Sequence, residues 1–336
     1  SISEAAMEQK HPWPGFWLDK PYYSLHAYCM HVYHEKLYKI ALDAGMTCPG
    51  RDGTAGVRGC IFCSSGGSGD FAIPVQGLPI AEQIRQGHAI FGEKRTGNRF
   101  IAYFQAYTNT YAPVMHLRRL YTQALDAPQI AGISIATRPD CLQPDILELL
   151  SELKQAYPDK FIWIELGLQT IHQKTADYIR RGYTLSCFTD AVAALSQRMI
   201  PVIVHIILGL PGESEENMYE TVSYLNTLPI SGVKIQLLHI LRGTDLAEEF
   251  LKGNVRVMEA DEYIRIVTGA LARLSPQTVI HRLTGDGPRR LLLAPLWSLD
   301  KRNILNHIHQ TMRAGNIWQG KRYGKENHDP GKLHPL

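Results

Sequence analysis

Short apolar runs alternate with longer amphipathic stretches along most of this 336-residue chain. The run at 202–208 is typical, because it is continuously apolar except for His205. Such runs predict parallel strands buried on both faces, and apolar residues at helical spacing predict helices that cover the sheet. We expect strands at 36–43, 99–106, 130–137, 160–167, 201–209 and 232–238. We expect helices at 80–93, 113–127, 143–157, 185–197 and 214–228.

Strand–helix units in succession predict an α/β fold, and six of them favour a partial (β/α)6 TIM-like barrel with a C-terminal α/β extension. We divide the chain into an N-terminal extension at 1–35, a barrel at 36–255 and a basic C-terminal subdomain and tail at 256–336. The subdomain should contain a short strand at 278–282 and a long helix near 303–313. We interpret residues 1–6, which precede Met7, as an expression-tag remnant.

The amino-acid composition indicates a globular protein. Apolar residues make up 45% of the chain and charged residues 20%, as in ordinary globular proteins. The sequence contains neither an apolar run long enough to span a bilayer nor a signal peptide at its start. We therefore expect a cytoplasmic protein without a membrane partner.

The polar, glycine-rich and cysteine-rich segments all follow predicted strands. They lie at 48–70, 105–111, 137–141, 169, 209–213 and 239–244. In parallel α/β folds the loops at the carboxyl ends of the strands converge on one face and build the site. This placement predicts an enzyme whose site lies at one mouth of the barrel.

Three clustered cysteines, Cys48, Cys60 and Cys63, lie in the first of these loops. They can surround one metal centre, and the glycines between them let the backbone approach it closely. A structural zinc site needs a fourth ligand at matching spacing, whereas Cys29, Cys141 and Cys187 are isolated in the sequence. A chance grouping of core cysteines explains so polar a loop poorly. We expect an external molecule to complete the coordination.

The motif Cys60-Ile-Phe-Cys63, with Cys48 upstream, resembles the radical S-adenosylmethionine (SAM) superfamily, in its Elp3/MiaB/NifB-like branch. Further stretches are similar to the bacterial YhcC/YtqA family, and the resemblance spans roughly 38–320. They are Tyr103-Phe-Gln-Ala-Tyr-Thr-Asn-Thr-Tyr-Ala-Pro113, Thr137-Arg-Pro-Asp-Cys141, Glu165-Leu-Gly-Leu-Gln-Thr170, Gly209-Leu-Pro-Gly-Glu213 and Leu292-Leu-Ala-Pro-Leu-Trp297.

This resemblance implies two cofactors: a [4Fe–4S] cluster on Cys48, Cys60 and Cys63, and SAM bound to the remaining iron. The residues that it implies for SAM binding are Phe62, Gln105, Ala106, Tyr107, Gln169, Arg181, Leu208 and Gly209. Ala136 stands where Elp3-like sequences often carry a glutamate, so another residue is expected to bind the ribose of SAM. An ordinary surface arginine is the alternative for Arg181.

Polar residues on the predicted strands and loops are candidates for catalysis. We select Lys234, His239 and Cys141, and note His205 and Gln236 beside them, because buried polar groups need partners. A single histidine on an apolar strand is more often a packed core residue than a catalyst. Cys141 is equally well explained as a small buried side chain.

Basic residues accumulate towards the C-terminus. From Arg273 onward there are eleven Lys or Arg against four Asp or Glu, which leaves the preceding residues with a net charge of −4. This distribution indicates a polyanionic partner, although a solvated tail fits the charge alone. We select five RNA-binding candidates: Arg282, Arg289, Arg290, Lys301 and Arg302.

The resemblance also implies a reaction. Superfamily members cleave SAM to methionine and a 5′-deoxyadenosyl radical, using an electron from a flavodoxin- or ferredoxin-type donor. The sequence looks closest to the Gram-positive YtqA-like subgroup, which is linked to trimming 5-carboxymethylaminomethyl(-2-thio)uridine at the tRNA wobble position to 5-aminomethyl(-2-thio)uridine. A protein or metabolite substrate, and a non-catalytic iron–sulfur electron carrier, are the alternatives.

Overall fold

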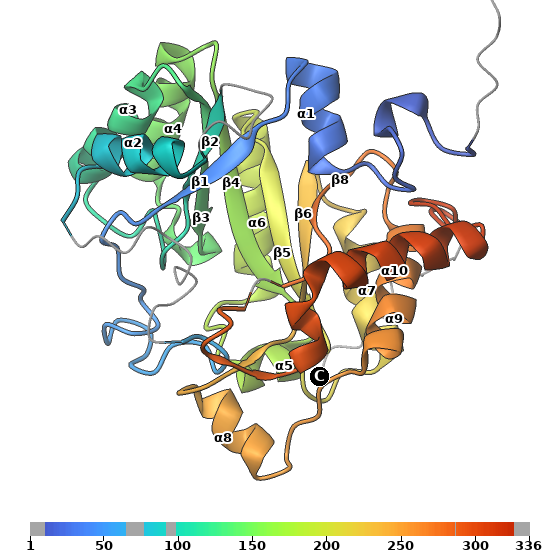
Figure 1. Cartoon of the computed structure of the whole chain (residues 1–336). Helices are drawn as coiled ribbons and strands as arrows, with labels where there is room; N and C mark the ends of the chain where they lie inside the picture. The colour runs from blue at the N-terminus through green and yellow to red at the C-terminus, as the bar shows by residue number, and fades with distance from the viewer. Residues whose placement is uncertain (1–10, 65–76, 92–98, 286, 326–336) are drawn as a thin grey trace, which may run out of the picture.

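A seven-stranded parallel sheet forms the centre of the computed structural model, which describes residues 11–64, 77–91, 99–285 and 287–325 (Figure 1). The strands follow the order β1-β2-β3-β4-β5-β6-β8, so each strand lies beside its predecessor in the sheet. Their bounds are β1 Tyr38–Leu42, β2 Phe100–Phe104, β3 Ile130–Thr137, β4 Phe161–Gln169, β5 Val202–Leu208, β6 Gly232–Leu237 and β8 Val279–Arg282. A separate antiparallel pair joins β7 (Ile240–Leu241) to β9 (Leu292–Ala294).

Helices cover the outer face of this curved sheet (Figure 1). They bury apolar side chains such as Ile133, Leu166 and Val204 in one continuous core, as expected for a strand layer with helices packed on it. The helices are α1 Leu25–Tyr33, α2 Ile80–Phe91, α3 Val114–Asp126, α4 Pro144–Ala156, α5 Gln173–Tyr178, α6 Leu185–Gln197, α7 Glu215–Leu225, α8 Asp245–Leu251, α9 Ala260–Arg273 and α10 Lys301–Ala314.

Local sequence signals explain where several helices begin. The Thr184 hydroxyl accepts a hydrogen bond from the backbone N–H of Cys187 at the start of α6. Ser214 and Asn217 form a reciprocal capping box at the start of α7. Each cap satisfies backbone donors that the first helical turn leaves unpaired, so these starts follow from short-range chemistry.

The predicted six strands and the partial α/β barrel are confirmed, and the short strand predicted at 278–282 joins the same sheet as its seventh strand. β8 comes from the segment that we assigned to the C-terminal subdomain, and it pairs in parallel with β6. The C-terminal part of the chain therefore builds a section of the barrel wall. Its long helix α10 packs beside α9 outside the barrel (Figure 1).

Helix α1, which the sequence analysis did not predict, lies at the end of the barrel opposite the cysteine loop (Figure 1). Its Cys29 belongs to a buried cluster with Ile101, Trp163 and Ile203 from the barrel strands. Tyr28 meets the Trp163 ring edge-on, with 6.1 Å between ring centres. α1 therefore closes the amino-terminal end of the barrel with apolar and aromatic side chains.

Gly132 in β3 offers a direct test of how closely the strands pack. A Cβ atom at this position would lie 2.5 Å from the backbone oxygen of Phe161, its partner on β4, and 2.3 Å from the Phe161 ring. We expect Gly132→Ala to lower the free energy of unfolding by about 1–3 kcal/mol, as overpacking does. Urea unfolding measures the change. Gly15→Ala is the control, because nothing lies within 4 Å of the added atom.

Candidate active site

A cavity of about 240 Å³ opens at the carboxyl ends of the strands. The loop after β1 supplies part of its lining. Each of the remaining six strands of the large sheet, or the loop that follows it, supplies the rest. Two of its lining residues, Tyr107 and Gln169, have positive φ angles of 62° and 65°. Non-glycine residues seldom adopt this conformation, and such strain concentrates at functional sites. The predicted mouth of the barrel is therefore a cavity with strained residues in its wall.

Cys48, Cys60 and Cys63 all line this cavity. The loop that carries them is folded on itself: the backbone N–H of Cys63 donates to the oxygen of Cys60 at 3.1 Å. Arg51 fixes the end of the loop, because its Nη2 donates to the backbone oxygens of Cys63 at 3.1 Å and Ser64 at 2.6 Å. The loop thus presents three thiols to one space.

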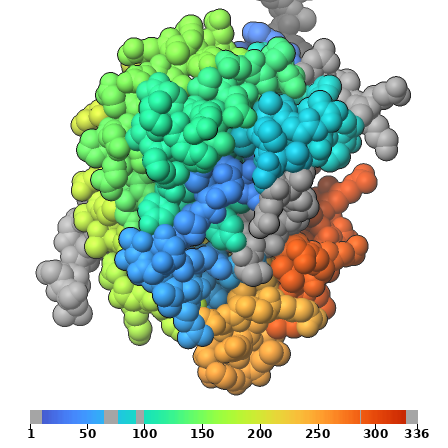
Figure 2. Space-filling view, turned by 90° about the vertical axis from the view of Figure 1, so that its left-hand side faces the viewer, coloured from blue at the N-terminus to red at the C-terminus, as the bar shows by residue number. Residues whose placement is uncertain are grey.

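Helix α8 and the turn after α5 contact the cysteine loop and hold it in place. The backbone N–H of Ile61 donates to Ile179 at 3.1 Å, and that of Leu246 donates to Ile61 at 3.0 Å. Asp245 pairs with Arg58 at 2.9 Å and with Arg180 at 2.7 Å. Figure 2 shows the loop lying directly against α8 at this end of the molecule. The position of the thiols is therefore fixed by contacts distant in sequence.

A buried polar cluster around Glu165 occupies the interior side of β4, β5 and β6. Lys234 Nζ lies 2.6 Å from Glu165 Oε1 and 2.9 Å from Oε2, and it donates to the Tyr103 hydroxyl at 3.1 Å. Lys39 Nζ is 3.6 Å from Glu165 Oε1, and His205 Nε2 is 3.8 Å from it. Burial alone would raise the pKa of Glu165, but Lys234 and Lys39 hold it well below its usual value. Glu165 is therefore ionised inside the barrel.

The family described as the radical SAM superfamily matches residues 53–225, just over half of the chain. This chain belongs to the radical SAM superfamily. A further family, the Radical_SAM C-terminal domain, matches residues 230–314. A [4Fe–4S] cluster and SAM are the cofactors of this superfamily, and the chain is a radical SAM enzyme.

Individual proteins agree with this assignment. YtqA of Bacillus subtilis is 40% identical over 318 residues, which cover 94% of this chain and 97% of YtqA. A Methanocaldococcus jannaschii protein named tRNA uridine(34) acetyltransferase is 25% identical over 190 residues, 55% of this chain and 33% of that protein. The solved structure of Methanocaldococcus infernus Elp3 superposes with a TM-score of 0.61 and 15% identity, over 84% of this chain and 64% of that one. Elp3 therefore shares the fold.

The cysteine loop fits a radical SAM cluster. In the described ranges, no group of three or more His, Cys, Asp or Glu side chains is arranged to hold a single metal ion. A [4Fe–4S] cluster has a different requirement, because each cysteine binds a separate iron. A Cβ atom at Gly50 would lie 3.7 Å from Cys48 Sγ, so glycine keeps the space beside this thiol open. We assign the three thiols to the cluster as a proposal.

Five of the eight predicted SAM-binding residues line the cavity: Phe62, Gln105, Tyr107, Gln169 and Arg181. Ala106, Leu208 and Gly209 are absent from the part of the lining that the structure describes. Leu208 points outward into the core beneath the helices. The N–H of Gly209 faces Met218 Sδ at 3.2 Å, and a Cβ atom there would lie 2.6 Å from Met258 Cε. Leu208 and Gly209 therefore support the end of β5 from the side that faces the helices.

Arg181 lines the cavity and makes contacts that the sequence analysis did not foresee. Its guanidinium donates to the backbone oxygens of Leu168 at 3.0 Å and Thr170 at 2.6 Å, the residues on either side of Gln169. It also donates twice to the backbone oxygen of Tyr183, at 3.1 Å and 2.9 Å. Arg181 therefore braces the backbone on both sides of Gln169, whose φ is positive, and its binding to SAM stays a prediction.

Arg138 is a site residue that the sequence analysis missed. Its Nη1 lies 3.9 Å from Cys48 Sγ, and its Nε and Nη2 donate to the two Asp140 oxygens at 2.9 Å and 2.7 Å. The guanidinium also lies 5.1 Å from the centre of the Tyr183 ring. A cation beside a cysteine favours its thiolate form. The available signal was the Thr-Arg-Pro-Asp motif after β3, to which we gave no role.

Glu165 was also missed, although its motif was recognised. It pairs in register with Ala136, the position where a glutamate is usual in Elp3-like sequences. A glutamate within an otherwise apolar strand was the signal that could have identified it. Lys234, which we predicted as a catalytic candidate, forms an ion pair with the Glu165 carboxylate.

His239 and Cys141 have different surroundings. His239 is buried and lines the cavity, where Gly285 and Gly287 pack so closely that a Cβ atom would lie 2.4 Å and 2.8 Å from its ring. Cys141 is buried beside Asp140, with 3.7 Å between its Sγ and Oδ1. Burial raises the pKa of this thiol to about 12, so it stays protonated near neutral pH. The buried-core explanation suits Cys141 better than catalysis.

The five RNA-binding candidates do not lie together. Arg289, Arg290, Lys301 and Arg302 are exposed. Arg282 is half-buried and lines the barrel cavity, where its Nη2 donates to Gln236 Oε1 at 2.8 Å. The reason is that β8 is part of the barrel wall, so Arg282 lies in the interior instead of on an outer basic surface.

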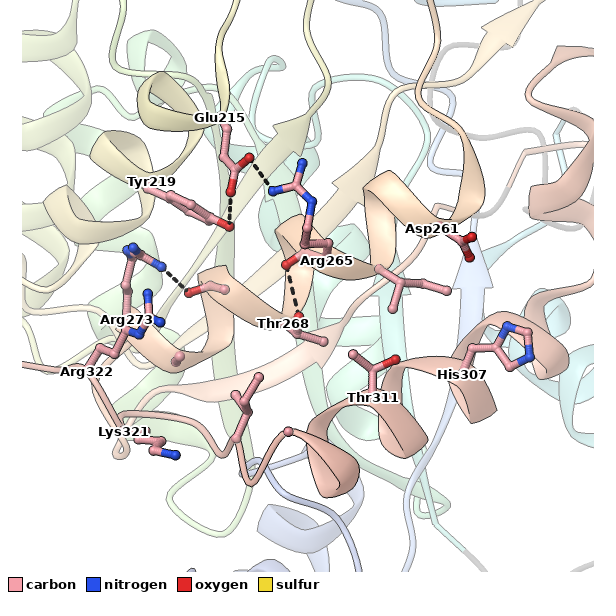
Figure 3. A pocket seen from close by; sticks show the side chains of 15 residues that line it. Glu215, Tyr219, Asp261, Arg265, Thr268, Arg273, His307, Thr311, Lys321 and Arg322 are labelled. Atoms are coloured by element: carbon pink, nitrogen blue, oxygen red, sulfur yellow. Dashed lines mark hydrogen bonds and ion pairs between the residues drawn. The ribbon is translucent and has the colours of Figure 1, made fainter.

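A second and larger cavity of about 600 Å³ lies outside the barrel, between α7, α9 and the end of α10 (Figure 3). Its charges are largely engaged: Arg265 pairs with Glu215, and Arg273 lies 3.9 Å from the Tyr219 ring centre and donates to Gly269. None of the predicted site residues in the described segments lines it. We place the chemistry in the barrel cavity, where the cysteines lie.

Within the described residues, no helix is both long and apolar enough to cross a membrane.

Proposed function

We propose that this radical SAM enzyme modifies tRNA, converting 5-carboxymethylaminomethyl(-2-thio)uridine at the wobble position to 5-aminomethyl(-2-thio)uridine. The carrying observation is the position of two basic residues at the edge of the cavity. Gly287 and Pro288 line the cavity, and the next two residues, Arg289 and Arg290, are exposed. Phosphates held there would place a nucleotide beside the mouth of the barrel. The similarity to a protein named tRNA uridine(34) acetyltransferase supports the same substrate class.

The reaction balances as an oxidation followed by hydrolysis. The side chain of the uridine is a methylene–amine–methylene–carboxylate, and loss of two electrons and two protons from the N–CH₂ unit gives an imine. Water then releases glyoxylate and leaves the 5-aminomethyl group. When bound, the cluster and SAM would supply the hydrogen-atom abstraction, with SAM as the two-electron oxidant overall and a flavodoxin- or ferredoxin-type protein as the initiating donor.

The residues of the barrel define what the protein contributes. Arg138 would stabilise the Cys48 thiolate, and Arg181 would hold Gln169 towards SAM. Trp163 and α1 close the amino-terminal end of the barrel, and this packing would keep water from reaching the cavity through that end. The wobble uridine would have to leave its stack to enter the cavity, as in other enzymes that act on a single base.

The deciding experiment is mass spectrometry of wobble nucleosides after incubation of tRNA with anaerobically reconstituted enzyme, SAM and a reductant. We expect carboxymethylaminomethyluridine to decrease as aminomethyluridine and glyoxylate increase together. Formation of 5′-deoxyadenosine without any changed tRNA nucleoside would favour a protein or metabolite substrate instead.

A salt titration tests the basic rim. We expect the double variant Arg289→Gln/Arg290→Gln to bind tRNA more weakly and to flatten the plot of log affinity against log salt by about 0.7–0.9 for each phosphate that it no longer binds. Arg118→Gln/Arg119→Gln on α3 removes the same charge from residues outside the described cavity lining and serves as the control. Equal slopes for the two double variants would argue against phosphate binding at the rim.

A further inference from the structure

Arg138, the residue directly after β3, is enclosed between the cysteine loop and the turn after α5. It is only 9% exposed, although it carries a charge. A Cβ atom at Gly50 would lie 3.5 Å from its Nη1, and one at Gly182 would lie 3.3 Å from its Nη2. The backbone of two loops therefore packs against the guanidinium, and glycine at both positions leaves it the space that it occupies.

Asp140 anchors one edge of this guanidinium. Nε and Nη2 of Arg138 donate to the two carboxylate oxygens at 2.9 Å and 2.7 Å, the bidentate geometry of a strong arginine–carboxylate pair. The Tyr183 ring centre lies 5.1 Å from the guanidinium carbon. Burial alone would lower the pKa of Arg138, but Asp140 holds it above its usual value. Arg138 is therefore a cation fixed in one orientation inside the protein.

The local sequence explains how the anchor is formed. Pro139–Cys141 is a short 3-10 turn, closed by a hydrogen bond from the backbone N–H of Cys141 to the oxygen of Arg138 at 3.1 Å. The turn brings the Asp140 carboxylate back to the arginine side chain. The Cys141 thiol, whose pKa is raised to about 12 by burial, donates to the same carboxylate at 3.7 Å. Arg138 and its anchor thus form one unit within four consecutive residues.

The corner of the guanidinium that Asp140 does not bind contacts a thiol of the cysteine loop. Nη1 lies 3.9 Å from Cys48 Sγ, which is an N–H···S hydrogen bond. Asp140 binds at Nε and Nη2, so within this ion pair it is the cation that contacts the sulfur. Charges that are largely buried are screened less than exposed ones. The guanidinium therefore acts on the sulfur at close range.

We propose that Arg138 sets the reduction potential of the iron–sulfur cluster through an N–H···S hydrogen bond to its Cys48 ligand. One electron from the donor protein makes the cluster more negative by one charge. A positively charged N–H donor beside a ligand sulfur stabilises that reduced form more than the oxidised form. Hydrogen bonds to the sulfurs and net charge are both known to set the potentials of such clusters. Arg138 thus makes the reduction that precedes SAM cleavage easier.

The first test is a redox titration of the reconstituted holoenzyme, followed by the EPR signal of the reduced cluster, without SAM or tRNA. In Arg138→Gln, the ratio of reduced to oxidised cluster at a fixed potential should fall about tenfold, as for the loss of one charge-assisted hydrogen bond. For one electron this is a shift of about 59 mV to lower potential. The midpoint of Arg138→Lys should lie between the two, because lysine keeps the charge but lacks the planar fork.

Arg256→Gln is the matched control. Arg256 forms the same bidentate pair, with Glu262 at 2.9 Å and 2.8 Å, but it is exposed and lies outside the described cavity lining. Its midpoint should equal that of wild type. Iron content shows how much cluster each variant holds. A wild-type midpoint for the clusters that Arg138→Gln holds, whether its iron content is full or reduced, overturns the inference, because a purely structural role changes only the amount of cluster.

A second measurement uses the wild-type protein itself. With ¹⁵N in the guanidinium of arginine, pulsed EPR of the reduced cluster should detect a ¹⁵N coupling from Nη1. The coupling should be lost in labelled Arg138→Lys and kept in labelled Arg256→Gln. Wild type without any such coupling, or a coupling that persists unchanged in Arg138→Lys, overturns the hydrogen bond.

Both measurements are independent of the proposed function, since neither contains tRNA. The inference rests instead on the assignment of Cys48 to the cluster. A cluster that survives in Cys48→Ala with a wild-type midpoint would overturn that assignment and the inference with it.

Discussion

Replacing Cys48, Cys60 or Cys63 singly with alanine is expected to abolish the cluster and all SAM cleavage. Each thiol lines the barrel cavity, and none of the three has a substitute at matching spacing in the sequence. Anaerobically purified wild-type protein should contain about four iron atoms per chain and show the broad visible absorbance of thiolate-bound iron, and each variant should lose both. Iron analysis and 5′-deoxyadenosine formation measure the effect.

The other cysteines provide matched controls. Cys29 is buried in the apolar cluster at the amino-terminal end of the barrel, and Cys187 lies in α6. Together with Cys141, each should tolerate alanine without loss of iron. Stoichiometric zinc that iron reconstitution does not displace, or a cluster that survives loss of Cys60, would contradict the assignment.

The second large effect is expected at Glu165, where Glu165→Gln leaves Lys234 buried without its carboxylate. Breaking a buried pair from one side typically lowers the free energy of unfolding by about 3–5 kcal/mol. Glu262→Gln, which breaks the exposed pair with Arg256, should cost no more than about 1 kcal/mol. Removing both charges in Glu165→Gln/Lys234→Met should recover part of the loss. A single variant as stable as Glu262→Gln would show that the pair is not stabilising.

The same pair sets a pH dependence. The pKa of Glu165 is lowered in the folded protein, so its contribution to stability is complete above the pKa of the unfolded chain and is lost as the pH falls through the folded value. Acidification below about pH 4.5, the ordinary range of a glutamate, should therefore destabilise wild type more than Glu165→Gln. Urea unfolding across this range measures the difference.

Regular patterns made most of the fold predictable. The strand at 130–137 and the helix at 185–197 were located to the residue, because an apolar run or an amphipathic period marks each one. β8 was found as a strand, but its partner was not, since only four residues with no alternating pattern specify it. α1 was missed because its aromatic-rich sequence lacks a clear helical period, and burial against Trp163 defines it.

The site was predictable only where chemistry is concentrated in sequence. The cysteines stand within sixteen consecutive residues, so spacing alone grouped them. Arg181 was assigned to SAM by resemblance, while its hydrogen bonds go to backbone oxygens that no sequence pattern reveals. Arg282 was grouped with exposed arginines, because charge counting cannot distinguish a residue that faces inward.

Because β8 joins the large sheet, one barrel wall combines strands from two regions that match different family models. The superfamily match ends at 225 and the C-terminal match begins at 230, so β6 and β8 belong to the second region while the cysteines at 60 and 63 belong to the first. A chimera that exchanges residues 230–314 with the same region of a relative would replace Lys234, Gln236 and Arg282 together and leave those two cysteines untouched. Such a chimera would change two strands of the barrel wall at once, while Cys60, Cys63 and the strands of the first region stay as they are.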